Sequence, residues 1–175
     1  MFSFSNPHIA FATAVDKMDI IYLINSAYRG ESSKQGWTTE AHLIAGETRT
    51  DVTSLEEVMN QQGSVIVKYI DGNNLIGCVN LQQHGDKIYL GMFSVAPKSQ
   101  GEGIGKKLLM AAEEYALHLY CKAIYMSVIG VRTELINWYM RRGYQDSGGR
   151  KPFQEDGVSG KHLQQMEFMI LEKAV

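Results

Sequence analysis

An apolar segment, a glycine-dense turn and an amphipathic segment follow one another between residues 91 and 109. The first leads into Pro97, and glycines stand at positions 101, 103 and 105 before the last begins. Glycine leaves its backbone N–H groups uncovered, and the first N–H groups of a helix have no partner within the helix. These donors and the positive end of the helix dipole form a seat for an anion. The turn therefore predicts a ligand that carries phosphate or pyrophosphate.

The length and composition are those of one ordinary globular domain. With 175 residues, 45% of them hydrophobic and 21% charged, the chain can bury a sizeable core, and we expect residues 1–175 to form a single domain. The net charge of -2 does not favour nucleic acid or an anionic membrane as a partner. No secretory signal is visible at the start, and no segment approaches the roughly 20 apolar residues of a membrane span.

The metal-binding residue types are few and scattered. Cys78 and Cys121 both lie beside apolar residues, without metal-ligand spacing, and are expected to be buried thiols. The five histidines form no His-x-x-x-His pair. We therefore expect no metal site and a reducing, cytoplasmic setting.

Hydrophobic periodicity predicts a mixture of helices and strands in one α+β domain. The first part is expected to hold a strand (8–13), a helix (14–28), a loop (29–39), a short helix stopped by Gly46 (39–45) and another helix (53–59). The second part is expected to hold a hairpin (64–70 and 75–81), a strand (87–95), a helix (103–119), a strand suited to parallel pairing (123–129), a helix stopped by Gly143 (133–142), a strand from Tyr144, a polar loop (148–160) and a final strand (163–171).

Three phosphate-binding patterns can be compared with the turn. A dinucleotide fingerprint, G-x-G-x-x-G, fails because Lys106 stands at the third glycine, and no acidic residue follows the next strand. A Walker A loop fails because Gln100 stands at its first glycine and Lys107 at its Ser/Thr. The third pattern, Gln/Arg-x-x-Gly-x-Gly/Ala, is met in full by residues 100–105.

This third pattern, between a strand and a helix, resembles the GNAT superfamily of acyl-CoA-dependent N-acetyltransferases. The segment 132–144 is similar to a second signature of that family, a helix whose tyrosine (Tyr139) stands four residues before a Gly-aromatic pair, Gly143-Tyr144. The two motifs come in the family's order with one strand between them, and the order of elements matches over nearly the whole chain. One position departs from the pattern, because many members carry Asn where this chain has Arg132.

The resemblance implies a fold and an acyl donor. The fold is a mixed, mostly antiparallel central sheet of six to seven strands, flanked by about four helices and splayed between the fourth and fifth strands. The donor is acetyl-CoA, used as a cosubstrate whose pantetheine arm lies along the splayed strand. The residues implied in cofactor binding are Met92, Phe93, Ser94 and Val95 on that strand, Gln100, Gly101, Glu102, Gly103, Ile104, Gly105 and Lys106 around the pyrophosphate, and Arg132.

The same resemblance assigns chemical roles to some of these residues. The backbone N–H of Met92 or Phe93 polarises the thioester carbonyl. Tyr139 protonates or hydrogen-bonds the departing sulfur and is the implied catalytic residue. Arg132 can donate to a pantetheine carbonyl or pair with a carboxylate such as Glu134 or Asp146.

The general base and the acceptor are left open by the sequence. Strand 87–93 holds no carboxylate, and Glu31, Glu40, His42, His84 and Glu134 are candidate bases by residue type alone. The acceptor pocket is expected beside the loop after the first helix, with contributions from the 150–153 segment. Arg29 suits an acceptor carboxylate, whereas Glu31 or Glu40 suits a cationic amine. The candidate substrate residues are Tyr28, Arg29, Glu31, Trp37 and Glu40.

These observations predict an N-acetyltransferase that moves an acetyl group from acetyl-CoA to an amine of a small molecule or peptide. The amine attacks the thioester directly, and we expect a monomer or a homodimer. The alternative from another class is a non-catalytic acyl-CoA-binding or sensor module, against which the retained Tyr139 speaks. A nucleotide-binding domain is disfavoured by the two failed patterns.

Overall fold

The computed structural model describes residues 1–175 and is organised around one seven-stranded sheet. The strand order is β1-β3-β4-β5-β6-β9-β7, in which β5 and β6 are parallel and the other neighbours are antiparallel. The strands are β1 (Ile9–Phe11), β3 (Ser64–Asp71), β4 (Asn74–His84), β5 (Lys87–Val95), β6 (Ala123–Ile129), β7 (Gln145–Pro152) and β9 (Glu167–Ala174). The expected hairpin, the strands over 87–95 and 123–129 and the parallel pair are confirmed.

Two helices cover one face of the β3–β5 half of the sheet. They are α1 (Lys17–Tyr28), preceded by a 3₁₀ turn at Ala14–Asp16, and α3 (Val52–Asn60). Ile24 and Leu55 from these helices are fully buried in one cluster with Cys78 of β4. The Asp51 carboxylate accepts a hydrogen bond from the Ser54 backbone N–H and so caps α3. This packing fixes the end of α1 beside β5.

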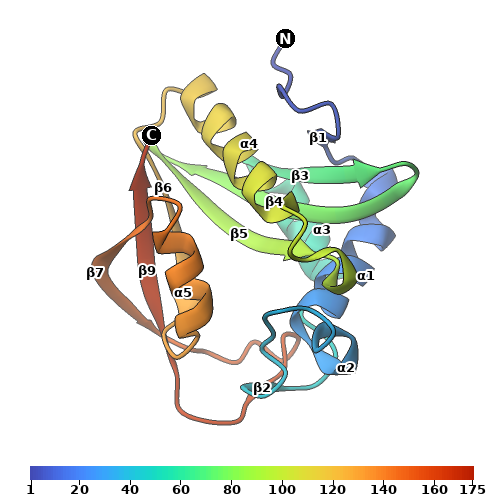
Figure 1. Cartoon of the computed structure of the whole chain (residues 1–175), viewed down its shortest axis with the longest axis vertical. Coiled ribbons are helices and arrows are strands. Elements are labelled where there is room, and N and C mark those ends of the chain that lie inside the picture. Colours follow the sequence, from blue (N-terminus) through green and yellow to red (C-terminus); the bar gives the residue numbers. More distant parts are fainter.

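Two further helices, α4 (Ile104–His118) and α5 (Thr133–Met140), lie on the opposite face (Figure 1). Leu108 of α4 and Ile136 of α5 belong to the same large core cluster as Ile88 of β5 and Leu171 of β9. The apolar face expected for the 103–119 helix accounts for this packing, because its buried positions recur at helical intervals. Both helices therefore stand over the centre of the sheet.

The two parallel strands separate after a short stretch of pairing. β5 pairs with β6 from Lys87 to Tyr89, opposite residues 123–125 of β6. Beyond this point the strands diverge in Figure 1, with α4 beside one and α5 beside the other. β5 and β6 are the fourth and fifth strands of the main sheet in chain order, so the predicted splay is confirmed. The divergence leaves one edge of β5 without a neighbouring strand.

The prediction of a helix over residues 39–45 is wrong. The N–H groups of Leu43 and Ile44 both reach the Glu40 carbonyl, which makes a single turn, and the chain then enters β2 (Ile44–Ala45). β2 pairs with β8 (Lys161–His162) in a separate two-stranded sheet. A local helical pattern of a few residues is weak, and here pairing with a segment more than 100 positions away prevails. The expected 29–39 loop also contains a short helix, α2 (Gly30–Ser33).

The final elements are displaced from their expected positions. Residues 148–152, expected in a loop, continue β7, with a register shift between Asp146 and Arg150. β7 lies at the edge of the sheet and its residues are mostly exposed, so their polarity resembles that of a loop. β9 begins at Glu167 rather than at residue 163, because residues 163–166 form a bend and an irregular segment between β8 and β9. No helix combines the length and apolar character that crossing a membrane requires.

Candidate functional site

A bulge in β5 lies where this strand leaves β6. Val79 of β4 faces two residues of β5, Met92 and Phe93, because the register shifts between the pairs Cys78–Ser94 and Asn80–Gly91. Met92 has a φ of 50°, a left-handed conformation that non-glycine residues seldom adopt. The bulge re-aims the backbone of β5 towards the gap between the strands.

The glycine turn continues directly from this strand. After a 3₁₀ turn at Pro97–Ser99, Gly101 and Gly103 have φ values of 85° and 83°, and α4 begins at Ile104. No side chain caps α4, and apart from the adjacent residues no atom lies within 4 Å of the position that a Cβ would take at either glycine. The first N–H groups of a 15-residue helix therefore face open space. This arrangement suits an anion, as the sequence predicts.

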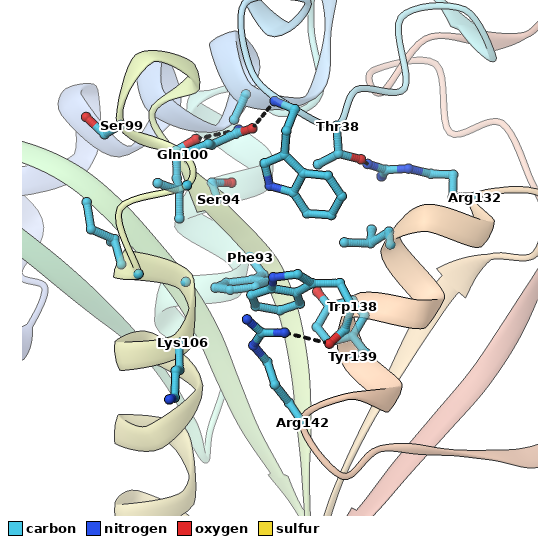
Figure 2. Close-up of a pocket in the computed structure, with 18 of the residues that line it drawn as sticks. Thr38, Phe93, Ser94, Ser99, Gln100, Lys106, Arg132, Trp138, Tyr139 and Arg142 are labelled. Carbon is cyan, nitrogen blue, oxygen red and sulfur yellow. Dashed lines mark hydrogen bonds between the residues drawn. The ribbon is translucent and has the colours of Figure 1, made fainter.

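A cavity of about 500 Å³ runs from this turn to α5. Its walls come from the free edge of β5, the turn, the first residues of α4 and one face of α5 (Figure 2). Four cations line it, Lys106, Arg132, Arg141 and Arg142, and no carboxylate does. Arg142 lies over the ring of Trp138, 3.6 Å from its centroid, and donates to its carbonyl. The positive lining favours an anionic ligand along the whole cavity.

The side chain of Gln100 connects the turn to the loop after α1. Its amide nitrogen donates to the Val95 carbonyl at 3.1 Å, and its amide oxygen accepts from the Trp37 backbone N–H at 3.0 Å. The Trp37 ring lies 6.5 Å from that of Trp138 across the cavity, with the loop residue about half exposed. Trp37 thus lines this first cavity.

Tyr139 of α5 lies at the far end of the first cavity, at 4% exposure. Burial raises the pKa of its phenol well above the usual value, and the neighbouring Tyr28 adds to the effect. Its ring packs 6.1 Å from Phe93 and 5.2 Å from Trp138. The phenol therefore stays protonated at neutral pH and can act as a proton donor.

Tyr28, the last residue of α1, holds the bulged strand from the other side. Its hydroxyl donates to the Phe93 carbonyl over 2.9 Å. Burial, and next the charge of Glu40, raise the pKa of Tyr28 to about 12. The group is thus a permanent donor under ordinary conditions.

Three buried charges, Arg29, Glu40 and Arg132, form one cluster behind this region. Glu40 accepts from Arg29 with one oxygen and from Arg132, at 2.8 Å, with the other. Arg132 also donates to the Thr38 hydroxyl at 2.6 Å, whereas its Nε has no hydrogen-bond partner and lies 3.7 Å from Glu134. The predicted pairing of Arg132 with a carboxylate thus occurs with Glu40 and Glu134, while Asp146 pairs with Arg150 instead.

A second cavity, of about 360 Å³, lies on the other side of the junction. It is lined by the end of α1, by residues 89–93 of β5, by residues 126–129 of β6, and by the end of β7 with the segment that follows it. Five residues line both cavities, and they are Tyr28, Phe93, Arg132, Leu135 and Tyr139. The two cavities therefore meet at the bulge and at the buried phenol.

The predicted site residues fall into three groups. The first cavity is lined by the predicted Phe93, Ser94, Val95, Gln100, Gly101, Gly103, Ile104, Gly105, Lys106, Arg132, Tyr139, Tyr28 and Trp37. The second is lined by Met92, Arg29 and Glu40, and also by those five residues common to both. Glu102 and Glu31 line neither cavity; both are exposed, and Glu31 pairs with Lys34.

The structure adds residues that sequence reasoning missed. Arg49 and Asp156 line the second cavity, together with Lys151 of the 150–153 segment. Arg49 precedes α3 and Asp156 belongs to the loop before β8, so the two come together through the tertiary fold. Neither stands in a motif, and no local pattern in the sequence indicates them.

The comparison with known families matches residues 23–144 to the acetyltransferase (GNAT) family, over more than half of the chain. The chain belongs to the GNAT acetyltransferase family. This GNAT chain is 36% identical over 63 residues to a spermine/spermidine N(1)-acetyltransferase of Bacillus subtilis, which is 35% of this chain and 41% of that one. It is 30% identical over 105 residues to a thialysine N-epsilon-acetyltransferase of Mus musculus, 58% of this chain and 59% of the relative. The chain thus spans about two to three fifths of the length of these relatives.

Solved structures of GNAT proteins share the fold. The ribosomal-protein-S18-alanine N-acetyltransferase of Escherichia coli superposes with a TM-score of 0.70 at 11% identity, over 95% of this chain and 92% of that one. An N-acetyltransferase from Staphylococcus aureus superposes with a TM-score of 0.69 at 14% identity, over 97% and 99% of the two chains. At these identities the likeness describes the architecture alone.

Proposed function

We propose that the protein transfers an acetyl group from acetyl-CoA to the amine of a small acceptor. The observation that carries the proposal is one cation-lined cavity that runs from the glycine turn, along the free edge of β5, to the Tyr139 phenol. Such a cavity suits a ligand of three parts: a pyrophosphate at the glycine turn, an extended amide-bearing arm along β5, and a thioester beside Tyr139. Membership of the GNAT family supports the same donor.

The donor fits the residues that are present. Open space over Gly101 and Gly103 and the uncapped start of α4 suit the pyrophosphate, with Lys106 beside it. Residues 92–95 of β5 have no neighbouring strand on the β6 side. The Phe93 and Val95 carbonyls already accept from Tyr28 and Gln100, and we infer that the remaining backbone groups of this edge bond the pantetheine amides as a strand would. When bound, acetyl-CoA supplies an activated thioester.

The acceptor enters through the second cavity and meets the thioester at the junction. The amine nitrogen forms a bond to the acetyl carbon as the carbon–sulfur bond breaks, and the sulfur takes the proton of the Tyr139 hydroxyl. The Tyr139 phenolate then takes a proton back from water. The backbone N–H of Met92 or Phe93, aimed by the bulge, polarises the carbonyl. None of the five residues shared by both cavities is a carboxylate or a histidine. We infer that a water molecule carries the proton of the amine away, which requires no dedicated base.

We further propose that residues 1–175 act as one N-acetyltransferase domain, as a monomer or a homodimer. Two free, buried thiols, Cys78 and Cys121, support a reducing, cytoplasmic setting. Burial raises the pKa of Cys78 to about 12, which keeps this thiol unreactive.

The test measures acetyl-CoA binding by calorimetry and amine-dependent thiol release over a panel of amines. Gly103→Asp places a carboxylate in the phosphate seat, and we expect it to abolish binding of acetyl-CoA. Gly103→Asn is the matched control, because Asn has nearly the same shape and the same tolerance of positive φ without the charge. Equal binding by the two variants would contradict the proposed seat. Tight binding of acetyl-CoA without turnover of any amine would favour the sensor alternative.

A further inference from the structure

The second cavity carries an excess of positive charge that its own residues do not neutralise. Two carboxylates line it, Glu40 and Asp156, against four cations, Arg29, Arg49, Arg132 and Lys151. Charges that share a small, partly buried space interact more strongly than they do in bulk water. Only those charged groups that have no partner within the protein can bind a charged ligand in this cavity.

Glu40 is fully engaged within the protein. Its two oxygens accept from Arg29 and Arg132, and its side chain is 9% exposed. Arg29 is engaged as well, because its Nε donates to the Ser159 carbonyl and its guanidinium to Glu40. Neither group is available to an acceptor. The sequence suggests Arg29 for an acceptor carboxylate and Glu40 for a cationic amine, but in the structure both are occupied by other residues.

Asp156 accepts hydrogen bonds from its own loop. One carboxylate oxygen accepts from the backbone N–H groups of Val158 and Ser159 and from the Ser159 hydroxyl. Burial raises the pKa of Asp156, but these hydrogen bonds, from Ser159 first, outweigh it and the net pKa lies below the usual value. The charge of Arg49 also lowers the pKa of Asp156, by a smaller amount, although the two residues form no ion pair.

Arg49 and Lys151 remain without a carboxylate partner. Arg49 lies with its guanidinium carbon 5.5 Å from the centroid of the Tyr28 ring, beside the junction. Lys151, on β7 opposite Phe168 of β9, is exposed at the outer wall. The buried Nε of Arg132, at the junction itself, also lacks a hydrogen-bond partner. Arg49, Lys151 and Arg132 all line the one cavity.

We propose that the acceptor is a free amino acid with an apolar side chain, whose carboxylate is bound by Arg49 and Lys151. This rests on the proposed acetyl transfer and names the substrate class of that same site. The amine reaches the junction beside Tyr139, and the side chain packs among apolar groups such as Met126, Val128 and Phe153. A guanidinium matches a carboxylate with two parallel hydrogen bonds, which makes Arg49 the main anchor.

A polyamine fits the same cavity poorly. A second ammonium group would meet Arg49 and Lys151 in a cavity whose four cations outnumber its two carboxylates. Glu40 already holds Arg29 and Arg132, and one oxygen of Asp156 already accepts from its own loop. Like charges at short range in a poorly screened space repel. The spermine/spermidine relative acts on polyamines by its name, and this chain is expected to differ from it.

The experiment compares one acceptor that carries a carboxylate, leucine, with three that do not: the amide leucinamide, the decarboxylated counterpart 3-methylbutylamine, and spermidine, which carries further ammonium groups. With a saturating concentration of acetyl-CoA, leucine is expected to have the highest kcat/KM. Each lost charge-assisted hydrogen bond to the carboxylate lowers the value by about 10-fold or more. Equal or faster acetylation of 3-methylbutylamine or spermidine overturns the inference and leaves the acetyl transfer intact.

Variants of the two anchors test the same contact from the side of the protein. Arg49→Gln and Lys151→Gln should each raise the KM for leucine, by about 10-fold for Arg49, without changing the KM for 3-methylbutylamine or for acetyl-CoA. Lys161→Gln is the matched control, because Lys161 is an exposed lysine of β8 that lines neither cavity. An equal loss with leucine and with 3-methylbutylamine would show general damage and contradict the assigned contact.

A binding measurement keeps the inference separate from catalysis. Leucine and leucinamide are titrated into the complex with CoA, and we expect only leucine to bind measurably, and Arg49→Gln to lose that binding. Binding of leucine without turnover of any amine supports the acceptor site and overturns the acetyl transfer. Turnover of other amines with no binding of leucine supports the acetyl transfer and overturns the amino acid as its acceptor.

Discussion

The hydroxyl of Tyr28 donates a 2.9 Å hydrogen bond to the carbonyl oxygen of Phe93, at the bulge where β5 parts from β6. This bond joins the end of α1 to the strand edge on which the acyl donor is proposed to lie. It also supplies the Phe93 carbonyl with a side-chain donor. The geometry of the bulge therefore depends on a side chain more than 60 positions away.

Tyr28→Phe should loosen the bulge while preserving the ring. We expect the free energy of unfolding to fall by about 1 kcal/mol in urea denaturation, the usual net value of a hydrogen bond. The kcat/KM should fall by about 10-fold because the N–H groups of the bulge lose their alignment. Tyr22→Phe is the control, since Tyr22 is 77% exposed on α1. An unchanged kcat/KM would mean that the bulge keeps its shape without this bond.

Tyr139→Phe should lower kcat by about 100-fold, because the departing sulfur loses its proton donor. Burial raises the pKa of Tyr139 well above its usual value, so the phenol holds its proton in the folded protein throughout the neutral and mildly alkaline range. The wild-type kcat is therefore expected not to decline between about pH 7 and 9 through loss of this proton. A wild-type kcat in a folded Tyr139→Phe protein, verified by circular dichroism, would contradict the assigned role.

Glu40→Gln should destabilise the fold strongly. The change leaves Arg29 and Arg132 buried with no negative charge between them, and breaking a buried pair in this way costs about 3 kcal/mol or more. The midpoint of urea denaturation should fall accordingly. Glu31→Gln, in an exposed pair with Lys34, should leave the midpoint unchanged. Equal midpoints for the two variants would show that the buried cluster contributes little.

Tyr144→Phe should stabilise the protein by about 1 kcal/mol. The Tyr144 side chain is 1% exposed and its hydroxyl oxygen has no hydrogen-bond partner, so burial of this group is uncompensated. Removing the oxygen leaves the ring in place, 5.7 Å from Tyr139. Thermal unfolding followed by calorimetry measures the effect, with kcat as a check that the Tyr139 ring is undisturbed. A lower melting temperature would indicate a hidden partner, such as a bound water.

Local patterns in the sequence determined much of the fold and one end of the site. The turn at Gly101 and Gly103 and the amphipathic helix after it could be predicted, because backbone conformation and helix periodicity depend on neighbouring residues. The same holds for the strands over residues 87–95 and 123–129. Tyr139 was identified through its motif, and the structure places it at the junction of the two cavities.

The tertiary structure decided which charges line the second cavity and which of them are paired. Glu40 is neutralised by Arg29 and Arg132, which stand 11 and 92 positions away, so its chemistry cannot be deduced from its own neighbours. Arg49 reaches the cavity only because its loop lies beside Tyr28 in the fold. β2 likewise forms through pairing with β8 rather than through a local helical pattern. Long-range contacts determine which charges are paired and which are free, and a sequence read residue by residue does not contain them.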